Sequence, residues 1–545
     1  MKSASRAAIP FWLWDVLFLV LAACYAWAAL CGVLEISSGG AALDSDLRTY
    51  AQGMAGVGHP ECFRDDPVLR VVTHHNSIWN VQRFLAVFLT PGDSYAVGLL
   101  RAGALALFIF YAGYYFLGRW LFRSPGLASL LALAMGVTFW VGWGTFWGVT
   151  HSDPVPRVFF AAIWPFLLLG AVAALNRPWL RLLVMLGVGL SIWVHSISAL
   201  ATGAMLFMAF ALKKSENQSL TSHLLHCLAC LSLFFIPVLA FLWPTLSQEK
   251  IFSSMDMEAL KNVFNLRYVE DYSMVWLQLR DYLLRYSLAP PLFLAGLAGW
   301  LLARSQGAAR VRALAGMYPG FLLGLAGVVI FSWLEGRWAA IAGHLPLGHE
   351  LVRGARFLVP LSWLAVVAGV ACFWPRLCVL WRVTTVVAAL SAVLLYTSDR
   401  QHIAALHYLH ASWLSPYGEE AQEAMHRSAE RRTVFETLRK MTRPGEMVFS
   451  NDGDLAVRYL ALRGLFHAFK DGANAFYDRD ADRARTWLRY NALMSREPTG
   501  YIDAWLASGV PWLLSSRPQD KALLEPYGDV LWENDGWLIA RRRGG

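Results

Sequence analysis

The sequence is poor in charged residues, in cysteine and in repeated segments. Asp, Glu, Lys and Arg make up only 16% of its 545 residues, whereas 57% are hydrophobic, and the mean hydropathy is +0.43. A water-soluble protein of this length is rarely so apolar. Runs of about 20 apolar residues, the length that a helix needs to cross a bilayer, recur through roughly the first 400 positions. The composition therefore predicts a polytopic α-helical membrane protein.

The seven cysteines form no recognisable disulfide framework. Six of them lie in or beside apolar runs, and Cys62 stands alone in a polar segment. Cys227 and Cys230 have the CxxC spacing of some redox and metal sites, but they lie inside a long apolar run. We therefore interpret them as two small apolar residues of a membrane helix.

We expect about 11 membrane spans. The first run, Phe11 to Leu34, lacks a clear small-x-small cleavage site and is longer than the core of a signal peptide, so we expect it to be a permanent span. The fifth and sixth are short and form either one kinked helix or a pair that meets at "VHSIS". The expected spans are 11–34, 95–118, 126–148, 157–175, 181–195, 197–212, 222–244, 287–303, 313–334, 356–374 and 378–396.

The net charge of +9 follows the expected membrane topology and does not indicate binding to nucleic acid. All of the excess lies in residues 1–398, which carry 27 basic and 18 acidic residues, whereas the remaining residues carry 20 of each. With a cytoplasmic N-terminus, the inner segments hold 13 basic residues, opposed only by Glu216 and by Asp15 just inside the first span. The positive-inside rule predicts this asymmetry. An odd number of spans then places the C-terminal part outside the cytoplasm.

Residues 1–396 are expected to form the transmembrane domain, with two long outer loops at 35–94 and 245–286. Both loops contain amphipathic stretches rich in aromatic residues, which suit helices that lie in the plane of the membrane surface. These stretches are "LRTYAQGM", "SIWNVQRFLAVFL", "MEALKNVFNLRYV" and "VWLQLRDYLLRY".

Residues 397–545 change character and predict a small extracytoplasmic α/β domain that rests on the outer loops. "EMVFSNDGD" is typical of a strand, a turn and a helix start, and "LAVRYLALRG" of a helix that Gly464 ends. "RARTWLRYNALM" predicts a helix and "PWLLSS" a strand. "DVLWENDGWLIARR" predicts two strands joined by a turn at "NDG".

Two carboxylates, Asp44 and Asp46, stand in "ALDSDLRTYAQG", soon after the first span. One acid at this place could simply cap the next helix, for which Ser45 or Asp46 is suitable. A pair of acids is harder to explain in that way. A carboxylate at a boundary between water and lipid can have a raised pKa, which suits a general base.

The same loop carries acids and imidazoles that could bind a divalent cation. Asp65 and Asp66 precede a proline, and His74 and His75 follow in "THHNS". Both side-chain types are common ligands of divalent ions. Their spacing matches no metal motif, however, and solvated turn residues would explain the pattern equally well.

Polar residues also gather at the boundaries of later spans. In "GVTHSDPVPRVFF", His151, Asp153 and Arg157 lie within a few residues, in a segment that two prolines hold extended. Such polar density at a membrane boundary indicates a functional site. His195, at the tip of the fifth span, is either part of this site or a packed polar residue.

Two arginines in "HELVRGARFLVP", Arg353 and Arg356, stand at the start of the tenth span. If the helix begins this early, their i, i+3 spacing puts them on one face. They could then clamp a phosphate by charge-assisted hydrogen bonds. The alternative is that both merely extend towards water from the membrane boundary.

Together these features resemble the GT-C superfamily of integral-membrane glycosyltransferases. Such enzymes have many spans, an acid in the first outer loop soon after the first span, interfacial helices in that loop and, in many members, a soluble outer domain. The stretch "VRYLALRGLFHAFKDG", which contains Lys470, also resembles segments in bacterial relatives, whereas a WWDYG-like signature and a clear match to protein mannosyltransferases are absent. The other matching motifs are "LDSD" at 43–46, "FRDDP" at 63–67, "HSDP" at 151–154, His195 and "RGARF" at 353–357.

The resemblance implies an inverting transfer of a sugar from a polyprenyl-phosphate-linked donor in the bilayer to a glycan, lipid or protein acceptor. The reaction would take place on the extracytoplasmic face of what we expect to be a bacterial inner membrane. Asp44 or Asp46 would take the proton from the acceptor hydroxyl, and Arg353 and Arg356 would hold the departing phosphate. The remaining candidates for substrate binding are Asp65, Asp66, His74, His75, His151, Asp153, Arg157, His195 and Lys470. A divalent cation is the one cofactor that these residues suggest.

Three other classes of protein remain as alternatives. A transporter or lipid flippase would carry ionisable residues deep in its spans and show two related halves, whereas here the charges avoid the span centres. A polymerase or ligase of the O-antigen type would share the chemistry but is expected to have one dominant outer loop. A scaffold without catalytic activity would use the C-terminal domain to bind a partner.

Overall fold

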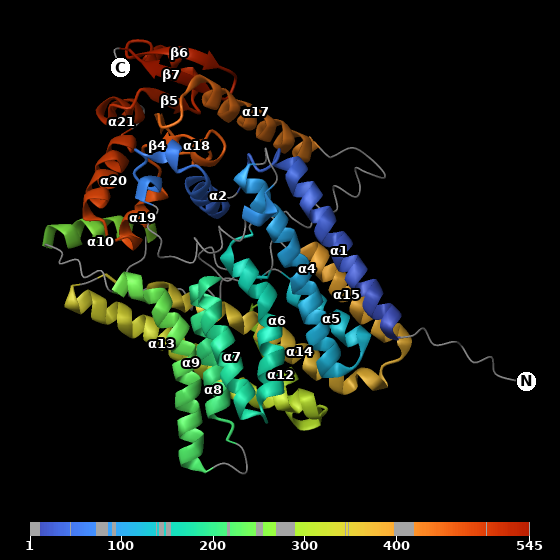
Figure 1. Ribbon diagram of the computed structural model, residues 1–545. Coiled ribbons are helices and arrows are strands. Elements are labelled where there is room, and N and C mark those ends of the chain that lie inside the picture. Colours follow the sequence, from blue (N-terminus) through green and yellow to red (C-terminus); the bar gives the residue numbers. More distant parts are fainter. Residues whose placement is uncertain are drawn as a thin grey trace, which may run out of the picture.

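The fold is a bundle of apolar helices with a small α/β domain at one end (Figure 1). The computed structural model describes residues 11–43, 45–71, 86–89, 94–137, 139–140, 146–148, 154–214, 219–246, 254–268, 289–343, 345–346, 348–396, 419–496 and 499–543. The predicted class, a polytopic helical membrane protein with a C-terminal α/β domain, is confirmed.

Each expected span overlaps an apolar helix. Within the described residues, 6 helices are long and apolar enough to cross a membrane, and further apolar helices of 10–17 residues accompany them. The helices of the bundle are α1 (Phe11–Ile36), α4 (Tyr95–Phe122), α5 (Pro125–Gly136), α6 (Pro156–Ala174), α7 (Pro178–Leu190), α8 (Ser196–Ala211), α9 (Leu220–Leu246), α12 (Ala289–Gln306), α13 (Ala309–Ala342), α14 (Leu358–Phe373) and α15 (Val379–Tyr396). Short 3-10 turns join or flank some helices, namely η1 (Pro60–Phe63), η2 (Leu69–Val71), η3 (Ala86–Phe88), η4 (Ser191–Trp193), η6 (His349–Phe357), η7 (Trp374–Arg376) and η8 (Pro518–Asp520).

The third expected span, 126–148, is wrong in its second half. Helix α5 ends at Gly136, and Val137 is already extended. Two short strands follow, β1 (Phe139–Trp140) and β2 (Phe146–Trp147), which pair antiparallel. Aromatic and β-branched residues between glycines favour this extended pairing over a helix, although their hydropathy is equally high.

The fifth and sixth spans are two helices rather than one. Helix α7 ends at Leu190, η4 follows, and α8 begins at Ser196. His195 is the N-cap residue of α8, and its side chain accepts a hydrogen bond from the backbone N–H of Ser198. The break therefore places the N-terminus of α8 at "VHSIS".

Close packing of small residues holds α8 against α13. A Cβ atom on Gly320 would lie 2.3 Å from the Cα of Ala209, and one on Gly324 would lie 2.5 Å from the Cα of Met205. In a membrane, where lipid is as apolar as the side chains, such close backbone approach is the main source of helix association.

An ion pair joins α1 to α4 near the N-terminal end of α1. Arg119 donates two hydrogen bonds to Asp15, from Nε at 2.6 Å and from Nη2 at 3.1 Å. The hydroxyl of Tyr115 donates a third, at 2.5 Å. Asp15, the acidic exception among the expected inner residues, is therefore a structural residue.

The C-terminal domain is built on a mixed five-stranded sheet with the order β4-β3-β5-β7-β6. Strand β3 runs parallel to β4 and β5, whereas β7 runs antiparallel to β5 and β6. The strands are β3 (Met447–Ser450), β4 (Gly464–Leu465), β5 (Trp512–Ser515), β6 (Gly528–Glu533) and β7 (Leu538–Arg542). The helices are α17 (Glu419–Met441), α18 (Ala456–Tyr459), α19 (Asp471–Tyr477), α20 (Ala481–Met494), α21 (Gly500–Ser508) and α22 (Lys521–Leu524).

Most of the predicted elements of this domain are present, and one is wrong. The strand at "PWLLSS", the helix at "RARTWLRYNALM" and the hairpin around "NDG" are observed. The helix expected at "LAVRYLALRG" is only α18, and Gly464 begins β4 instead of ending a helix. A Cβ atom on Gly464 would lie 2.2 Å from the Sδ of Met447, so the Met447 side chain fills the space beside this glycine.

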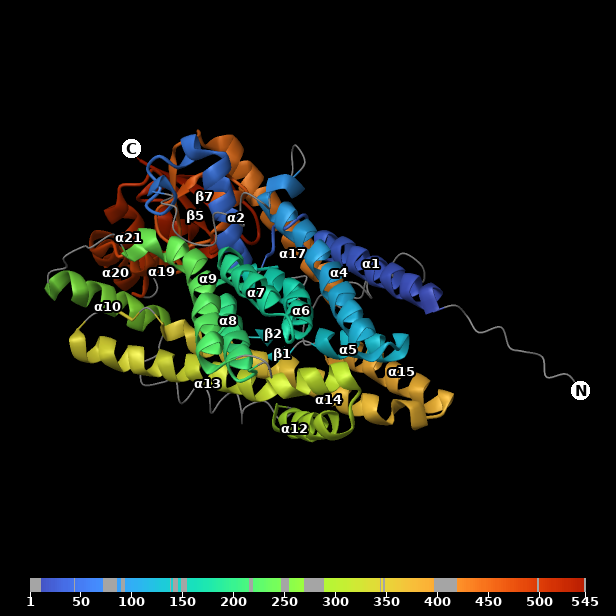
Figure 2. The same ribbon diagram turned by 60° about the horizontal axis from the view of Figure 1, so that its bottom comes forward.

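Helices α2 (Ser45–Gly58) and α10 (Ser254–Tyr268) lie beside the C-terminal domain, as two views agree (Figure 1, Figure 2). The apolar side of α10, with Leu260 and Phe264, packs against Phe476 and Trp487 of α19 and α20. Part of the surface that we expected to face the membrane is therefore covered by the domain. The stretch at 275–286 lies outside the described residues, and so does the stretch at 77–89 except for residues 86–89, which include the 3-10 turn η3.

Candidate active site

Three polar segments meet where the ends of α6, α8 and η6 approach one another. Pro156 begins α6, where its missing N–H is not needed, and this places Arg157 in the first turn. Arg356 lies at the end of η6, directly before α14. His195 caps α8, which begins at the break after η4. The sequence thus folds these residues onto the ends of rigid helices.

Arg356, Ser198 and His195 form a buried hydrogen-bonded chain. The guanidinium of Arg356 donates to Ser198 Oγ. Ser198 Oγ lies 2.8 Å from His195 Nδ1, and the Ser198 backbone N–H donates to the same nitrogen at 3.1 Å. Arg356 Nη2, another donor, is 3.4 Å away from that nitrogen. Because donors surround Nδ1, we infer that His195 is neutral and carries its proton on Nε2.

Arg157 and Arg356 line the same small cavity, which has room for about one water molecule. Ser198 and Gly148 contribute polar groups to its wall. The rest of the lining is apolar and consists of Trp147, Phe160, Ala161 and Phe357. Two cations in such surroundings are weakly screened, so the cavity favours an anion.

Asp46 lies beside these cations in the first turn of α2. Its Oδ1 accepts a hydrogen bond from Lys470 Nζ at 2.6 Å, and its Oδ2 is 3.9 Å from Arg157 Nη1. The Asp46 side chain is 50% exposed. Burial would raise the pKa of this carboxyl, but Lys470, Arg157 and Arg353 together lower it below its usual value. Asp46 is therefore ionised at neutral pH.

Arg353 of η6 is a further cation near Asp46. Its Nη1 lies 3.3 Å from Glu350 Oε1, one turn earlier in η6. Arg353 and Glu350 both interact electrostatically with Asp46. The described candidates Asp46, Arg157, His195, Arg353, Arg356 and Lys470 are therefore gathered in one region, although their places in the sequence span 425 positions.

Asp65 and Asp66 are not part of this group. Asp65 is exposed. Asp66 is fully buried and accepts hydrogen bonds from Arg458 Nε at 2.8 Å and from backbone N–H groups that include those of Val68 and Leu69, both at 2.8 Å. These contacts occupy the Asp66 carboxylate and join the first outer loop to the C-terminal domain.

The remaining candidates, Asp44, His74, His75, His151 and Asp153, lie outside the described residues. Within the described part of the chain, no group of three or more His, Cys, Asp and Glu side chains could hold a metal ion. The idea that the first outer loop binds a divalent cation stays a prediction, because it rests partly on His74 and His75.

Sequence reasoning missed Ser198, Glu350 and Arg458. Ser198 stands three residues after His195, where a side chain of the first helical turn faces its cap, so the spacing contained a usable signal. Glu350 and Arg353 likewise have the i, i+3 spacing of neighbours. Nothing in the sequence pairs Arg458 with Asp66, because 392 positions separate them.

The chain thus has the architecture of a polytopic helical membrane protein with a C-terminal α/β domain. No family model matches it, and no curated protein matches it. It is similar to a crystal structure of ArnT from Cupriavidus metallidurans bound to undecaprenyl phosphate, with 13% identity, a TM-score of 0.49 and coverage of 99% of both chains. The apo structure of the same ArnT gives 13% identity, a TM-score of 0.45, and coverage of 97% of this chain and 98% of that one. Similarity at this level concerns the layout of the elements and decides nothing about the chemistry.

Proposed function

We propose that the protein is a membrane glycosyltransferase that uses a polyprenyl-phosphate-linked sugar. The observation that carries this proposal is the cavity shared by Arg157 and Arg356, next to the carboxylate of Asp46, at the ends of membrane helices. Transfer of a sugar from a phosphate needs cations that stabilise the leaving group and a carboxylate that accepts a proton. The cations line the cavity, and Asp46, which lies beside Arg157, is two positions from the other acid of the same loop, Asp44.

The two arginines are suited to the phosphate of the donor. Each can donate bidentate hydrogen bonds to phosphate oxygens, and the N-terminus of α8 adds a favourable dipole. The cavity is smaller than a phosphate group, so binding requires the Arg157 and Arg356 side chains to separate. A prenyl chain attached to this phosphate could remain in the bilayer beside the helices.

The acceptor side of the reaction needs a carboxylate base. A carboxylate takes the proton from the acceptor hydroxyl, whose oxygen attacks the anomeric carbon, and the bond from that carbon to the phosphate oxygen breaks. Asp46 is held by Lys470 and Arg157, and the lowered pKa makes it a weak base. We therefore propose Asp44 as the base and Asp46 as the residue that holds Lys470 and Arg157 in place.

The test uses purified protein in vesicles with a radiolabelled sugar on undecaprenyl phosphate, the lipid bound in the ArnT structure. Arg356→Ala and Arg157→Ala should reduce transfer by about 100- to 1,000-fold, as loss of a leaving-group stabiliser does. Asp44→Asn should reduce it by about 100- to 10,000-fold while lipid binding survives. Arg304→Ala is the matched control, because Arg304 is an exposed residue of α12 whose guanidinium lies over Trp300.

Two outcomes would count against the proposal. Wild-type protein that moves the labelled lipid between leaflets without releasing its sugar would be a flippase. Transfer that survives Arg157→Ala, Arg356→Ala, Asp44→Asn and Asp46→Asn would mean that this group of residues is structural.

A further inference from the structure

A fully buried guanidinium joins the first outer loop to the C-terminal domain. The Arg458 side chain is 0% exposed. It donates to Asp66 at 2.8 Å, to Gln52 Oε1 at 2.8 Å and to both carboxylate oxygens of Asp471 at 2.8 and 2.9 Å. The carbonyl of Leu465 accepts a further bond at 2.9 Å. All of its hydrogen-bonding directions are thus used to connect two distant parts of the chain.

Arg458 contacts one residue near each partner of the Asp46–Lys470 ion pair. Asp471 follows Lys470 directly and begins α19. Gln52 belongs to α2, six residues after Asp46, which is about 9 Å along the same helix. One guanidinium therefore contacts both helices at whose N-terminal ends the two partners of this ion pair lie.

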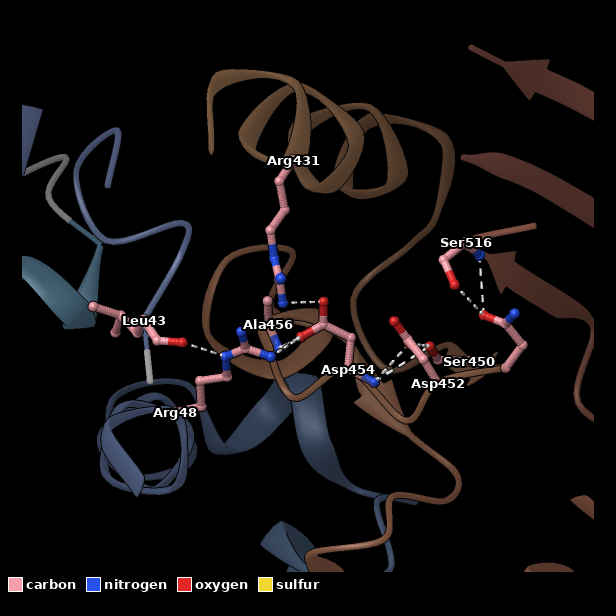
Figure 3. A network of polar contacts seen from close by, with 9 residues as sticks. Leu43, Arg48, Arg431, Ser450, Asp452, Asp454, Ala456 and Ser516 are labelled. Carbon is pink, nitrogen blue, oxygen red and sulfur yellow. Dashed lines mark hydrogen bonds and ion pairs between the residues drawn. The ribbon is translucent and has the colours of Figure 1, made fainter. Parts of the chain in front are cut away.

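A second contact ties α2 to the same domain (Figure 3). Arg48 donates to the carbonyl of Leu43 at 2.8 Å and to Asp454 Oδ1 at 3.5 Å. Asp454 also accepts a hydrogen bond from Arg431 of α17. This contact restrains the start of α2, but it does not contact Lys470.

We propose that Arg458 is a positioning residue that makes the C-terminal domain part of the active site, by holding Lys470 against Asp46. This inference rests on the proposed glycosyltransferase function and concerns a residue that does not itself touch the cavity. Lysine cannot replace Arg458, because an ammonium group cannot make a bidentate contact with Asp471 and also reach Asp66 and Gln52.

The consequence is measurable as a change in pH dependence. The groups that face Asp46 are Lys470 of the C-terminal domain, Arg157 of α6, and Arg353 and Glu350 of η6. Asp46 must be ionised to hold its partners, so activity falls as the pH drops through its pKa. A cation next to a carboxylate lowers its pKa. Displacement of Lys470 should therefore move the acidic limb of the pH profile to higher pH.

The experiment compares pH profiles of kcat/KM for full-length variants with undecaprenyl-phosphate sugar. Lys470→Met and Arg458→Lys should each move the acidic limb upward by about one pH unit, and the double variant should move it no further, because both act through the same contact. Asp471→Asn, a nearly isosteric change, serves as a second variant in case Arg458→Lys does not fold. Arg463→Lys is the matched control, since Arg463 is also buried in this domain but bonds to Thr442 and to carbonyls.

The inference is overturned if the acidic limb stays at the wild-type pH in both Arg458→Lys and Asp471→Asn. It is also overturned if Arg463→Lys shifts the acidic limb as far as Arg458→Lys does. Hydrogen exchange gives a readout that needs no activity. Exchange in α2 and in residues 465–477 should rise in Arg458→Lys but not in Arg463→Lys, and unchanged exchange in these segments would also contradict the inference. Wild-type protein without any transfer would contradict the proposed function alone, since the exchange comparison still tests the contact.

Discussion

The contact between Asp46 and Lys470 determines how readily the Asp46 carboxylate binds a proton. Burial would raise the pKa of Asp46, but Lys470 and the nearby arginines lower it. An acid held in this way is a good anchor for cations and a poor acceptor of protons. This supports the proposal that Asp44 takes the proton.

His467, in the C-terminal domain, is expected to make the stability of the protein depend on pH. Burial, together with the charge of Arg458, lowers the pKa of His467 to about 4. The folded protein therefore binds this proton less readily than the unfolded chain, whose histidine has a pKa near its ordinary value of 6.5. The stability that neutral His467 provides is complete above about pH 6.5 and is lost as the pH falls towards 4.

His467→Phe should remove this part of the pH dependence. The aromatic ring fits the surroundings, since the rings of Trp487 and Tyr490 lie 6.1 and 6.3 Å from the imidazole. Between pH 7 and 4 the wild type should lose about 3 kcal/mol more stability than the variant, from about 1.4 kcal/mol per unit of pKa difference. Unfolding of purified protein in detergent, followed at several pH values, measures the difference. Parallel curves for the two proteins would show that His467 does not titrate in this way.

At the scale of elements, the packing of α8 on α13 makes a prediction about small residues. Gly324→Leu would push a side chain into the backbone of α8 and should destabilise the protein by about 1–3 kcal/mol or more. Gly327, in the same helix, has nothing within 4 Å of an added Cβ, so Gly327→Leu is a close control. Thermal unfolding and the yield of monodisperse protein report the effect. Equal behaviour of the two variants would mean that close approach of α8 and α13 is not required.

Hydropathy predicted the membrane helices because their length and composition suffice to identify them. It did not predict where α5 ends, because strands β1 and β2 consist of residues just as apolar as those of the helix. The hairpin of β6 and β7, by contrast, was predicted correctly from two strand-like stretches with a turn sequence between them. The role of Gly464 depends on the proximity of Met447, a contact that no local pattern records.

The candidate site could be predicted only in part, for a similar reason. Arg157, His195 and Arg356 became candidates because polar residues at membrane boundaries are uncommon. The contact between Asp66 and Arg458 could not be predicted, because a buried acid bound to an arginine and an exposed acid have the same appearance in the sequence. Whether acids meet cations or solvent depends on tertiary packing.

For the whole molecule, the orientation in the membrane is a prediction of the charge distribution. We expect the N-terminus in the cytoplasm and the C-terminal domain outside it. A reporter that is active only in the cytoplasm, fused after Arg543, should be silent, whereas the same reporter fused after Lys214 should be active. A signal from the fusion after Arg543 would invert the topology and place the candidate active site on the cytoplasmic face.

The contact between Lys470 and Asp46 spans 424 positions of the chain, and this separation has a consequence for biosynthesis. Ribosomes make α2 early and Lys470 late, so α1, α2 and the following helices are made long before the lysine exists. During that interval Asp46 lacks this partner, and the buried guanidinium of Arg458 has not yet arrived to join Gln52 and Asp66. The nascent protein can thus occupy the membrane with its arginine-lined cavity in place, but the complete set of charges forms only when synthesis has passed residue 471.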